Sequence, residues 1–297
     1  MHKRLAISLS AALIFGWQVS ATPEGAAKLV SAVKWEQPDD WFGGFSGIEV
    51  SADGSGFTAV TDSGTLVTGA FERDAGIIQS VETLTNEPVQ DRQGLITHDY
   101  DRDAEGLAIR PDGQLFISFE GRHQVFSYGE EGGRGTELDR HADFHRLERN
   151  GSLEALAIDE TDRLYTLAET SVSGADGLPV YRFEQGQWTH AFTLPERVGF
   201  KPVGADFGPD GLFYLLERKF NGFGFRTSVR RFDVTEDVVS NEETLILTST
   251  GTHDNLEGLA VWEDPQGQTR LTMISDDNFI FYQRTEIVEY QLPAPAF

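Results

Sequence analysis

The sequence contains no cysteine among its 297 residues. Thiol nucleophiles, cysteine-ligated zinc and disulfide bonds are therefore excluded, and the fold must be stabilised by its own core. Long amphipathic helices are hard to find. The sequence also lacks a G-x-S-x-G nucleophile elbow, an H-E-x-x-H zinc motif, a P-loop and a dinucleotide fingerprint. A serine esterase mechanism is not expected from a chain with these absences.

Basic residues are scarce relative to acidic ones. Lysine and arginine number 24 against 48 aspartates and glutamates, which gives a formal net charge of −24. Such a surface repels nucleic acid and anionic lipid. We therefore expect no nucleic-acid partner and no membrane partner. An excess of carboxylates keeps a protein soluble, and it also suits a protein that works with a cation.

The N-terminal segment has the three parts of a secretory signal. MHKR is basic, residues 5–19 form an apolar run, and residues 19–21 supply small side chains before a cleavage site. The apolar run is short for a membrane span. We expect cleavage after Ala21, with an uncleaved anchor as the alternative. Residues 22–297 are then one domain that is periplasmic or secreted.

The chain repeats a strand–turn–strand pattern five times. Glycine (31) and phenylalanine (21) are plentiful, as expected of short strands that are joined by tight turns and packed with aromatic residues. The copies are FSGIEVSADGSGFTAVTDSG (45–64), DAEGLAIRPDGQLFISFEG (103–121), SLEALAIDETDRLYTLAET (152–170), PVGADFGPDGLFYLLERKF (202–220) and NLEGLAVWEDPQGQTRLTMISDD (255–277). Further strand-like segments follow the copies. Four short strands per repeat predict the blades of a β-propeller.

We expect an all-β fold consisting of one propeller with five four-stranded blades, six blades being the alternative. The residues after the fifth copy, together with those before the first, leave room for one blade of generous size. The segment 27–36 is predicted to add a strand to that last blade and so to close the ring.

Carboxylates recur at two places in the repeat. The first place lies at the start of the first strand, and three copies have a glutamate there: Glu105, Glu154 and Glu257. The other two copies have Ser46 and Val203 there, but each carries an acid three residues later: Glu49 and Asp206. Side chains three apart in a strand point to opposite faces, so both places reach the axis only if a bulge or turn intervenes.

The second place, at the end of the second strand, is acidic in all five copies. Its residues are Asp62, Glu120, Glu169, Glu217 and Asp276, with Asp277 beside the last. Because the innermost strand of each propeller blade lines a central channel, we expect the acids of both places to converge at one mouth of this channel. Two carboxylates about 5 Å apart repel by roughly 3 kcal/mol at an effective dielectric constant near 20.

A bound cation relieves this repulsion. Oxygen-only ligands favour Ca²⁺, with Mg²⁺ the less favoured choice. The predicted metal ligands are Glu105, Glu154, Glu257, Glu49, Asp62, Asp206 and Asp277. The alternative is that the acids accept backbone N–H groups and brace neighbouring blades.

Three arginines follow the second acids closely: Arg122, Arg218 and Arg284. An arginine among metal-bound carboxylates is suited to hold a phosphate or carboxylate of a substrate. Salt bridges between blades are the alternative for these side chains. His253 lies four residues before Glu257 and is the histidine best placed to reach the site.

The repeats, above all NLEGLAVWEDPQGQTRLTMISDDNFIFYQRTEIVEYQL (255–292), resemble a bacterial family named for the esterase-like activity of phytase, or phytase-like domain. The resemblance runs from about Phe45 to Leu292, and the first and fourth copies depart from it at Ser46 and Val203.

The resemblance implies a metal-dependent phosphoric-ester hydrolase, phytase-like or phosphodiesterase-like, whose repeated acids are the active residues. The catalytic candidates are Glu120, Glu169, Glu217 and Asp276. We expect a monomer that acts on a small-molecule phosphoester. The alternatives are a non-catalytic binding propeller braced by calcium and a lactonase-like hydrolase on the same scaffold.

Overall fold

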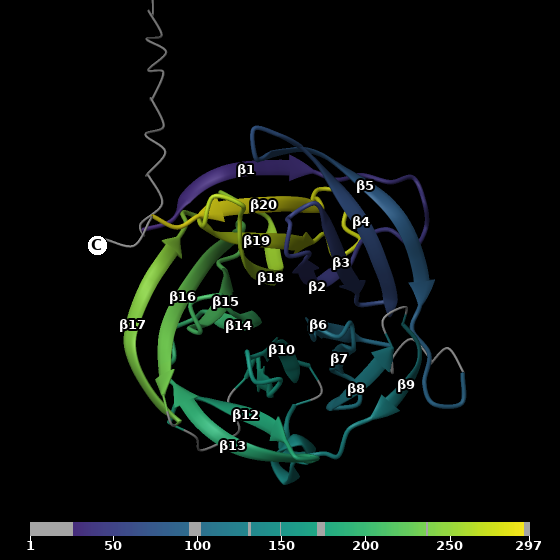
Figure 1. The fold of residues 1–297 in the computed structure, drawn as a ribbon, viewed down its shortest axis with the longest axis vertical. Helices are drawn as coiled ribbons and strands as arrows, with labels where there is room; N and C mark the ends of the chain where they lie inside the picture. The colour runs from purple at the N-terminus through teal and green to yellow at the C-terminus, as the bar shows by residue number, and fades with distance from the viewer. Residues whose placement is uncertain are drawn as a thin grey trace, which may run out of the picture.

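Five antiparallel sheets of four strands each surround a central axis as the blades of a propeller (Figure 1). The computed structural model of the chain describes residues 26–94, 102–129, 132–148, 150–170, 176–235 and 237–293. The predictions of an all-β propeller and of five blades are confirmed, and the six-bladed alternative is wrong. The expected signal segment, residues 1–21, lies outside the described residues.

Blades one to four each run from an innermost to an outermost strand in chain order. Blade one consists of β2 (Phe45–Val50), β3 (Gly56–Thr61), β4 (Thr65–Asp74) and β5 (Ile77–Pro88). Blade two consists of β6 (Ala104–Ile109), β7 (Leu115–Phe119), β8 (Gln124–Gly129) and β9 (Gly132–Glu137). Blade three consists of β10 (Leu153–Ile158), β11 (Leu164–Ala168), β12 (Leu178–Glu184) and β13 (Gln187–Leu194), after a short 3₁₀ helix, η2 (Ala142–Arg146).

Blades four and five complete the ring. Blade four consists of β14 (Lys201–Phe207), β15 (Phe213–Phe220), β16 (Phe225–Thr235) and β17 (Val238–Leu247). Blade five consists of β18 (Asn255–Glu263), β19 (Thr269–Asp276), β20 (Glu286–Gln291) and β1 (Lys28–Lys34). β1 pairs antiparallel with β20, as in Lys34 opposite Glu286. The predicted closure by the N-terminal segment is confirmed.

Aspartates fix the turn between the first and second strands of every blade. In each turn, the aspartate side chain accepts the backbone N–H of the residue two positions later, which is an Asx turn. The five aspartates are Asp53, Asp112, Asp159, Asp210 and Asp264. The recurring turn explains why the repeat is visible in the sequence.

Small residues follow the first acid position because the inner strands approach one another closely. A Cβ atom added to Gly106 would lie 2.6 Å from the Cβ of Leu156, and one added to Gly204 would lie 2.5 Å from the carbonyl oxygen of Glu257. Each inner strand contacts the inner strands of both neighbouring blades. The E-G-L-A pattern is therefore a packing requirement of the ring as well as the location of an acid.

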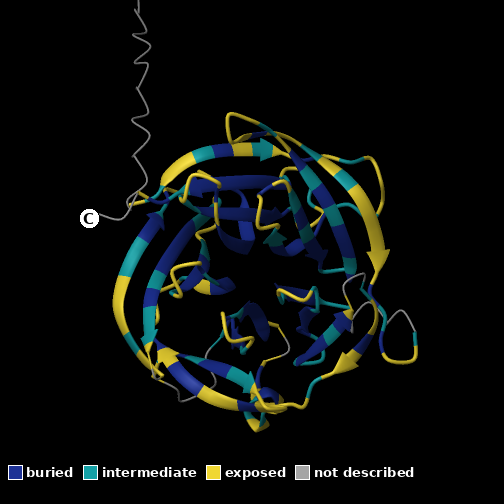
Figure 2. Cartoon of the chain, in the orientation of Figure 1, coloured by how far each residue is buried: buried dark blue, intermediate teal, exposed yellow. Residues whose placement is uncertain are grey.

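Apolar side chains fill the spaces between blades. One cluster joins Phe45 and Phe57 of blade one to Ile274 and Ile287 of blade five. Exposed residues concentrate on the outermost strands, whereas the inner strands are buried (Figure 2). Within the described ranges, no helix has the length and apolar character needed to cross a bilayer.

Candidate functional site

The ladder between the first and second strands is irregular at the first acid position in every blade. The shifts in register fall between Phe45 and Gly47, Ala104 and Leu107, Leu153 and Ala155, Pro202 and Gly204, and Leu256 and Gly258. A bulge leaves a residue unpaired and re-aims its side chain. A bulge is therefore present in all five blades, and it contains the first acid position each time.

The structure brings Glu105, Glu154 and Glu257 together. All three are buried, with at most 9% of each residue exposed. Burial raises the pKa of Glu105 well above its usual range, and the charges of Glu154 and Glu257 raise it further. Burial, with Glu169 and Glu257 nearby, raises the pKa of Glu154 in the same way. Three inner strands thus place their glutamates within electrostatic reach of one another.

Acids from the ends of the second strands surround this trio. Burial and the charge of Asp276 raise the pKa of Asp62 to about 7. Burial and the charge of Glu257 raise the pKa of Asp276 to about 8. Glu120 accepts the backbone N–H groups of Gly151 and Ser152. We call the whole set the acidic cluster: Asp62, Asp103, Glu105, Glu120, Glu154, Glu169, Glu257 and Asp276.

Blade four contributes an arginine to the cluster in place of an acid. Gly204 pairs with Leu216 and Pro202 pairs with Glu217, whereas in blade five Gly258 pairs with Ile274 and Leu256 pairs with Ser275. Glu217 therefore corresponds to Ser275, and the next residue, Arg218, corresponds to Asp276. The alignment that put Glu217 at the second acid position is wrong by one residue. In a strand, one residue moves a side chain to the opposite face.

Arg218 and Glu217 consequently have different partners. Arg218 contacts Glu257 at 3.1 Å and Glu169 at 3.4 Å. Glu169 is also paired with Lys201, at 2.7 Å. Glu217 is fully buried against Arg230, with 2.5 Å between Oε1 and Nη2. Arg218 thus pairs with two acids of the acidic cluster, whereas Glu217 belongs to a separate ion pair within blade four.

Three carboxylates of blade two are close enough to share one cation. Asp103, Glu105 and Glu120 each offer an oxygen atom, and these atoms all lie within 4.8 Å of one another. Burial, followed by a hydrogen bond with Glu120, raises the pKa of Asp103 to about 7. Sequence reasoning missed Asp103, although it precedes Glu105 by only two residues.

A buried amide in blade five adds an oxygen that needs a partner. Asn255 is 1% exposed, and its Nδ2 donates to Glu257 at 2.6 Å and to Asp276 at 3.4 Å. Within the described part of the chain its Oδ1 accepts no hydrogen bond. Buried polar atoms normally have a partner. Carboxylate and amide oxygens in one cluster are the donors that Ca²⁺ takes, so these residues fit the expected calcium ion.

Four predicted site residues lie away from this cluster or serve other contacts. Glu49 and Asp206 together line a separate cavity of about 640 Å³. This cavity lies at the ends of the inner strands that are farther from the acidic cluster. Both acids stand three residues after the first acid position, and three residues along a strand cover about 10 Å, so their side chains do not reach the acidic cluster. Arg122 lies over the ring of Phe126 and 3.9 Å from Glu137. Asp277 accepts the N–H of Gly44 at 3.2 Å, which joins blade five to blade one.

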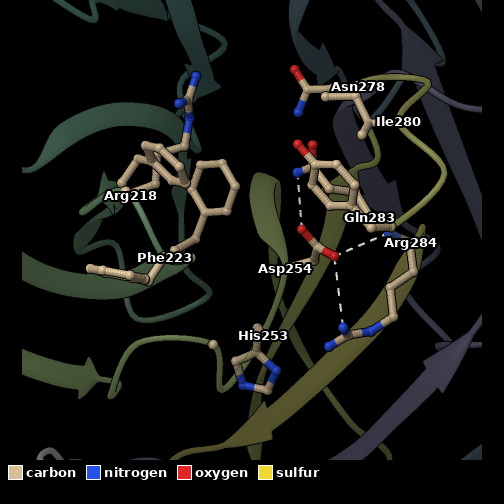
Figure 3. Close-up of a pocket in the computed structure, with 14 residues that line it drawn as sticks. Arg218, Phe223, His253, Asp254, Asn278, Ile280, Gln283 and Arg284 are labelled. Atoms are coloured by element: carbon tan, nitrogen blue, oxygen red, sulfur yellow. Dashed lines mark hydrogen bonds and ion pairs between the residues drawn. The ribbon is translucent and has the colours of Figure 1, made fainter.

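A second cavity of about 640 Å³ opens beside the acidic cluster and includes Arg218 (Figure 3). Arg284 lines it and pairs with Glu286 at 3.0 Å and with Asp254 at 3.7 Å. His253, also in its wall, contacts the hydroxyl of Tyr290 at 2.7 Å. Burial lowers the pKa of His253 to about 4, so this ring is neutral at physiological pH.

The raised pKa values predict that the metal-free protein loses stability as the pH rises. Burial raises the folded-state pKa of Asp62 and Asp103 to about 7 and that of Asp276 to about 8, above the usual value near 3.9 of an unfolded chain. Between about pH 4 and pH 8 the folded state therefore binds more protons, and its stability falls with rising pH. With a chelator present, we expect Tm at pH 8 to be lower than at pH 5 by on the order of 10 °C.

Thermal melts monitored by circular dichroism measure this difference. Added Ca²⁺ should reduce it, because the cation replaces the protons that relieve the repulsion. A metal-free Tm that is flat or rises between pH 5 and pH 8 would contradict the assigned shifts.

Comparison with known proteins gives one family and several distant structures. A family model described as "Phytase-like: Esterase-like activity of phytase" matches residues 40–279. No curated protein matches significantly.

Three solved structures illustrate the distant similarity. A streptogramin B lyase has a TM-score of 0.41 at 14% identity, over 91% of this chain and 74% of that chain. A PQQ-bound aldose sugar dehydrogenase from Streptomyces coelicolor has a TM-score of 0.46 at 11% identity, over 92% of this chain and 100% of that chain. A gluconolactonase from Xanthomonas campestris has a TM-score of 0.44 at 14% identity, over 84% of this chain and 72% of that chain.

Proposed function

The chain belongs to the phytase-like family, and from that premise we propose that it is a calcium-dependent phosphoric-ester hydrolase. The observation that supports this best is the group Asp103, Glu105 and Glu120, whose carboxylate oxygens lie within 4.8 Å of one another. These three residues would hold the ion. When bound, Ca²⁺ supplies neutralisation of phosphoryl charge and polarisation of a water molecule.

Arg218 is the residue that we assign to the phosphoryl group. Its contacts with Glu169 and Glu257 hold the guanidinium at the border between the acidic cluster and the neighbouring cavity. Its planar set of donors suits a tetrahedral oxyanion. Glu169 acts as the positioning residue for Arg218, and Arg284 serves as a second cation at the far wall of the cavity.

Asp276 is the carboxyl group best suited to acid–base work. Its Oδ1 accepts the N–H of Asn278 at 2.6 Å, which orients the group, and only 7% of the residue is exposed. Burial raises its pKa to about 8 in the metal-free protein, and on this ground we assign Asp276 as the group that donates a proton to a leaving oxygen. Glu217, an earlier catalytic candidate, is occupied by Arg230 and takes no part in this proposal.

We propose that the substrate is a small-molecule phosphoester, that the protein is periplasmic or secreted, and that it acts as a monomer without nucleic-acid or membrane partners. The second candidate function is a non-catalytic binding propeller. It is favoured by Glu120 and Asp277, which accept backbone N–H groups from neighbouring blades and so brace the ring.

Chelation separates the two candidates. The purified protein is expected to hydrolyse chromogenic phosphomonoesters or phosphodiesters, to lose that activity in a chelator, and to regain it with Ca²⁺. Arg218→Met should raise KM by at least about tenfold through the loss of a charge-assisted contact. Glu82→Gln, on the exposed strand β5, is the matched control and should leave activity unchanged. A calcium-dependent Tm without turnover of any ester would favour the binding propeller.

A further inference from the structure

Exposed aromatic side chains border the cavity beside the acidic cluster on two sides. Phe223, in the β15–β16 loop, is 96% exposed, and Tyr282, in the β19–β20 loop, is 70% exposed. Both line the cavity, together with Phe220, Phe225 and Ile280. Apolar rings that face solvent around a concave site are typical of ligand binding and offer nothing to the core.

The first loop is built to present Phe223. β15 and β16 continue their ladder to Phe220 opposite Phe225, so the hairpin extends two residues beyond Arg218. Asn221 then accepts the N–H of Phe223 at 3.1 Å, and its Nδ2 donates to Thr250 at 2.7 Å. The loop is therefore fixed by hydrogen bonds at the position where it exposes its ring.

The second loop is fixed as well. The N–H of Ile280 donates to the carbonyl of Asp277 at 2.8 Å, and the N–H of Gln283 donates to the carbonyl of Ile280 at the same distance. Asp254 accepts two hydrogen bonds, one from the Nε2 of Gln283 at 3.1 Å and one from the backbone N–H of Arg284 at 3.0 Å. Figure 3 shows Asp254 at the centre of these contacts, across the cavity from Arg218 and Phe223.

The charges of the cavity limit the ligand to few negative groups. Arg218 is shared with Glu169 and Glu257, and Arg284 is shared with Asp254 and Glu286. The two guanidinium groups are thus already offset by carboxylates. One phosphoryl or carboxyl group can be accommodated, whereas a ligand with several phosphates would meet a net negative site.

We propose that this cavity binds a planar aromatic group that is joined to a single anionic group, and that it discriminates against polyphosphorylated ligands. The aromatic group would lie between Phe223 and Tyr282, and the anion would point toward Arg218 and the acidic cluster. The inference deepens the proposed function, because it assigns aryl-type phosphoesters rather than inositol polyphosphates as the substrate class. It requires binding alone, whereas the proposed function also requires turnover.

Titration calorimetry in Ca²⁺ buffer tests this inference with three probes. Two are phosphonates that cannot be hydrolysed, phenylphosphonate and methylphosphonate, and the third is the polyanion inositol hexakisphosphate. Phenylphosphonate is expected to bind at least about tenfold more tightly than methylphosphonate, since ring stacking and apolar burial contribute on the scale of a tenfold change. Inositol hexakisphosphate should bind no more tightly than methylphosphonate. Phe223→Ala and Tyr282→Ala should each reduce the phenyl preference at least threefold. Leu84→Ala, an exposed apolar residue on outer strand β5, is the control and should leave the preference intact.

Equal affinity for the phenyl and methyl probes would overturn the inference, as would a preference that survives both aromatic variants or tight binding of the hexakisphosphate. Ring-selective binding in a protein that hydrolyses no ester would support this inference while removing the proposed hydrolase. Hydrolysis without ring selectivity would do the opposite. Both aromatic substitutions are at exposed positions, so we expect the variants to fold. Melting curves of the variants check this.

Discussion

Replacing Arg230 by methionine is expected to lower the free energy of unfolding by about 3–5 kcal/mol, as is typical when one partner of a buried ion pair is removed. Arg230 is 1% exposed, and it holds Glu217 through two hydrogen bonds, Nε to Oε2 at 2.8 Å and Nη2 to Oε1 at 2.5 Å. Its Nη1 also donates to the carbonyl of Pro195 at 2.9 Å. Without the guanidinium, Glu217 becomes an uncompensated charge in the middle of blade four. Urea unfolding followed by circular dichroism measures the loss.

The control is the double variant Glu217→Gln/Arg230→Met, which removes both charges. It should recover much of the lost stability, because an uncharged pair of similar volume has no desolvated charge to neutralise. Neither variant should alter calcium affinity, since Glu217 lies outside the acidic cluster. A large change in calcium affinity, with little change in stability, would return Glu217 to the place that the sequence alignment gave it.

The architecture could be read from the sequence because its causes are local and repeated. An Asx turn between two short strands and a small residue after the first acid both recur in every blade. Asp53 and Gly47 show these requirements in the first copy as Asp112 and Gly106 do in the second. Repetition at intervals of 49 to 59 residues, between positions 47, 106, 155, 204 and 258, then gives the number of blades. Only the order of the strands at the ring closure required a longer-range argument.

The position of Glu217 could not be read in the same way. In β15 the two residues before it, Leu215 and Leu216, are both fully buried, so alternation between polar and apolar residues does not indicate which face is which. The next two residues are Glu217 and Arg218, and either could end the apolar run. The choice depends on the bulge between Pro202 and Gly204, which sets the register of the partner strand. That feature belongs to the paired strands rather than to either segment alone.

The aromatic cavity was missed for a different reason. Its walls come from a loop around Phe223 and a loop around Tyr282, which are far apart in the sequence and outside the repeated pattern. The aromatic residues of these loops resemble those of the core in composition. Only their exposure, together with the neighbouring Arg218, identifies them as candidates for ligand binding. The acids Glu49 and Asp206 show the converse case, because a sequence pattern grouped them with residues that lie at the other end of the inner strands.

The double variant Asp103→Asn/Glu105→Gln is expected to raise the Tm of the metal-free protein and to abolish the stabilisation by Ca²⁺. Both wild-type side chains are carboxylates next to Glu120, and their oxygens lie within 4.8 Å of one another. Like charges about 5 Å apart repel by roughly 3 kcal/mol at an effective dielectric constant near 20. The amides remove this repulsion while keeping the shape of the side chains. Thermal melts at pH 8, with chelator and with Ca²⁺, measure both effects.

The same variant should reduce phosphoesterase activity at least about 100-fold, because neutral amides hold Ca²⁺ far less well than carboxylates. Loss of activity together with a gain in metal-free stability is the trade-off expected of a site that is built for a ligand. A bracing role for these acids predicts the opposite sign: amides in place of structural acceptors would lower the metal-free Tm. The direction of the Tm change therefore distinguishes a calcium site from a set of braces, whether or not the correct ester has been found.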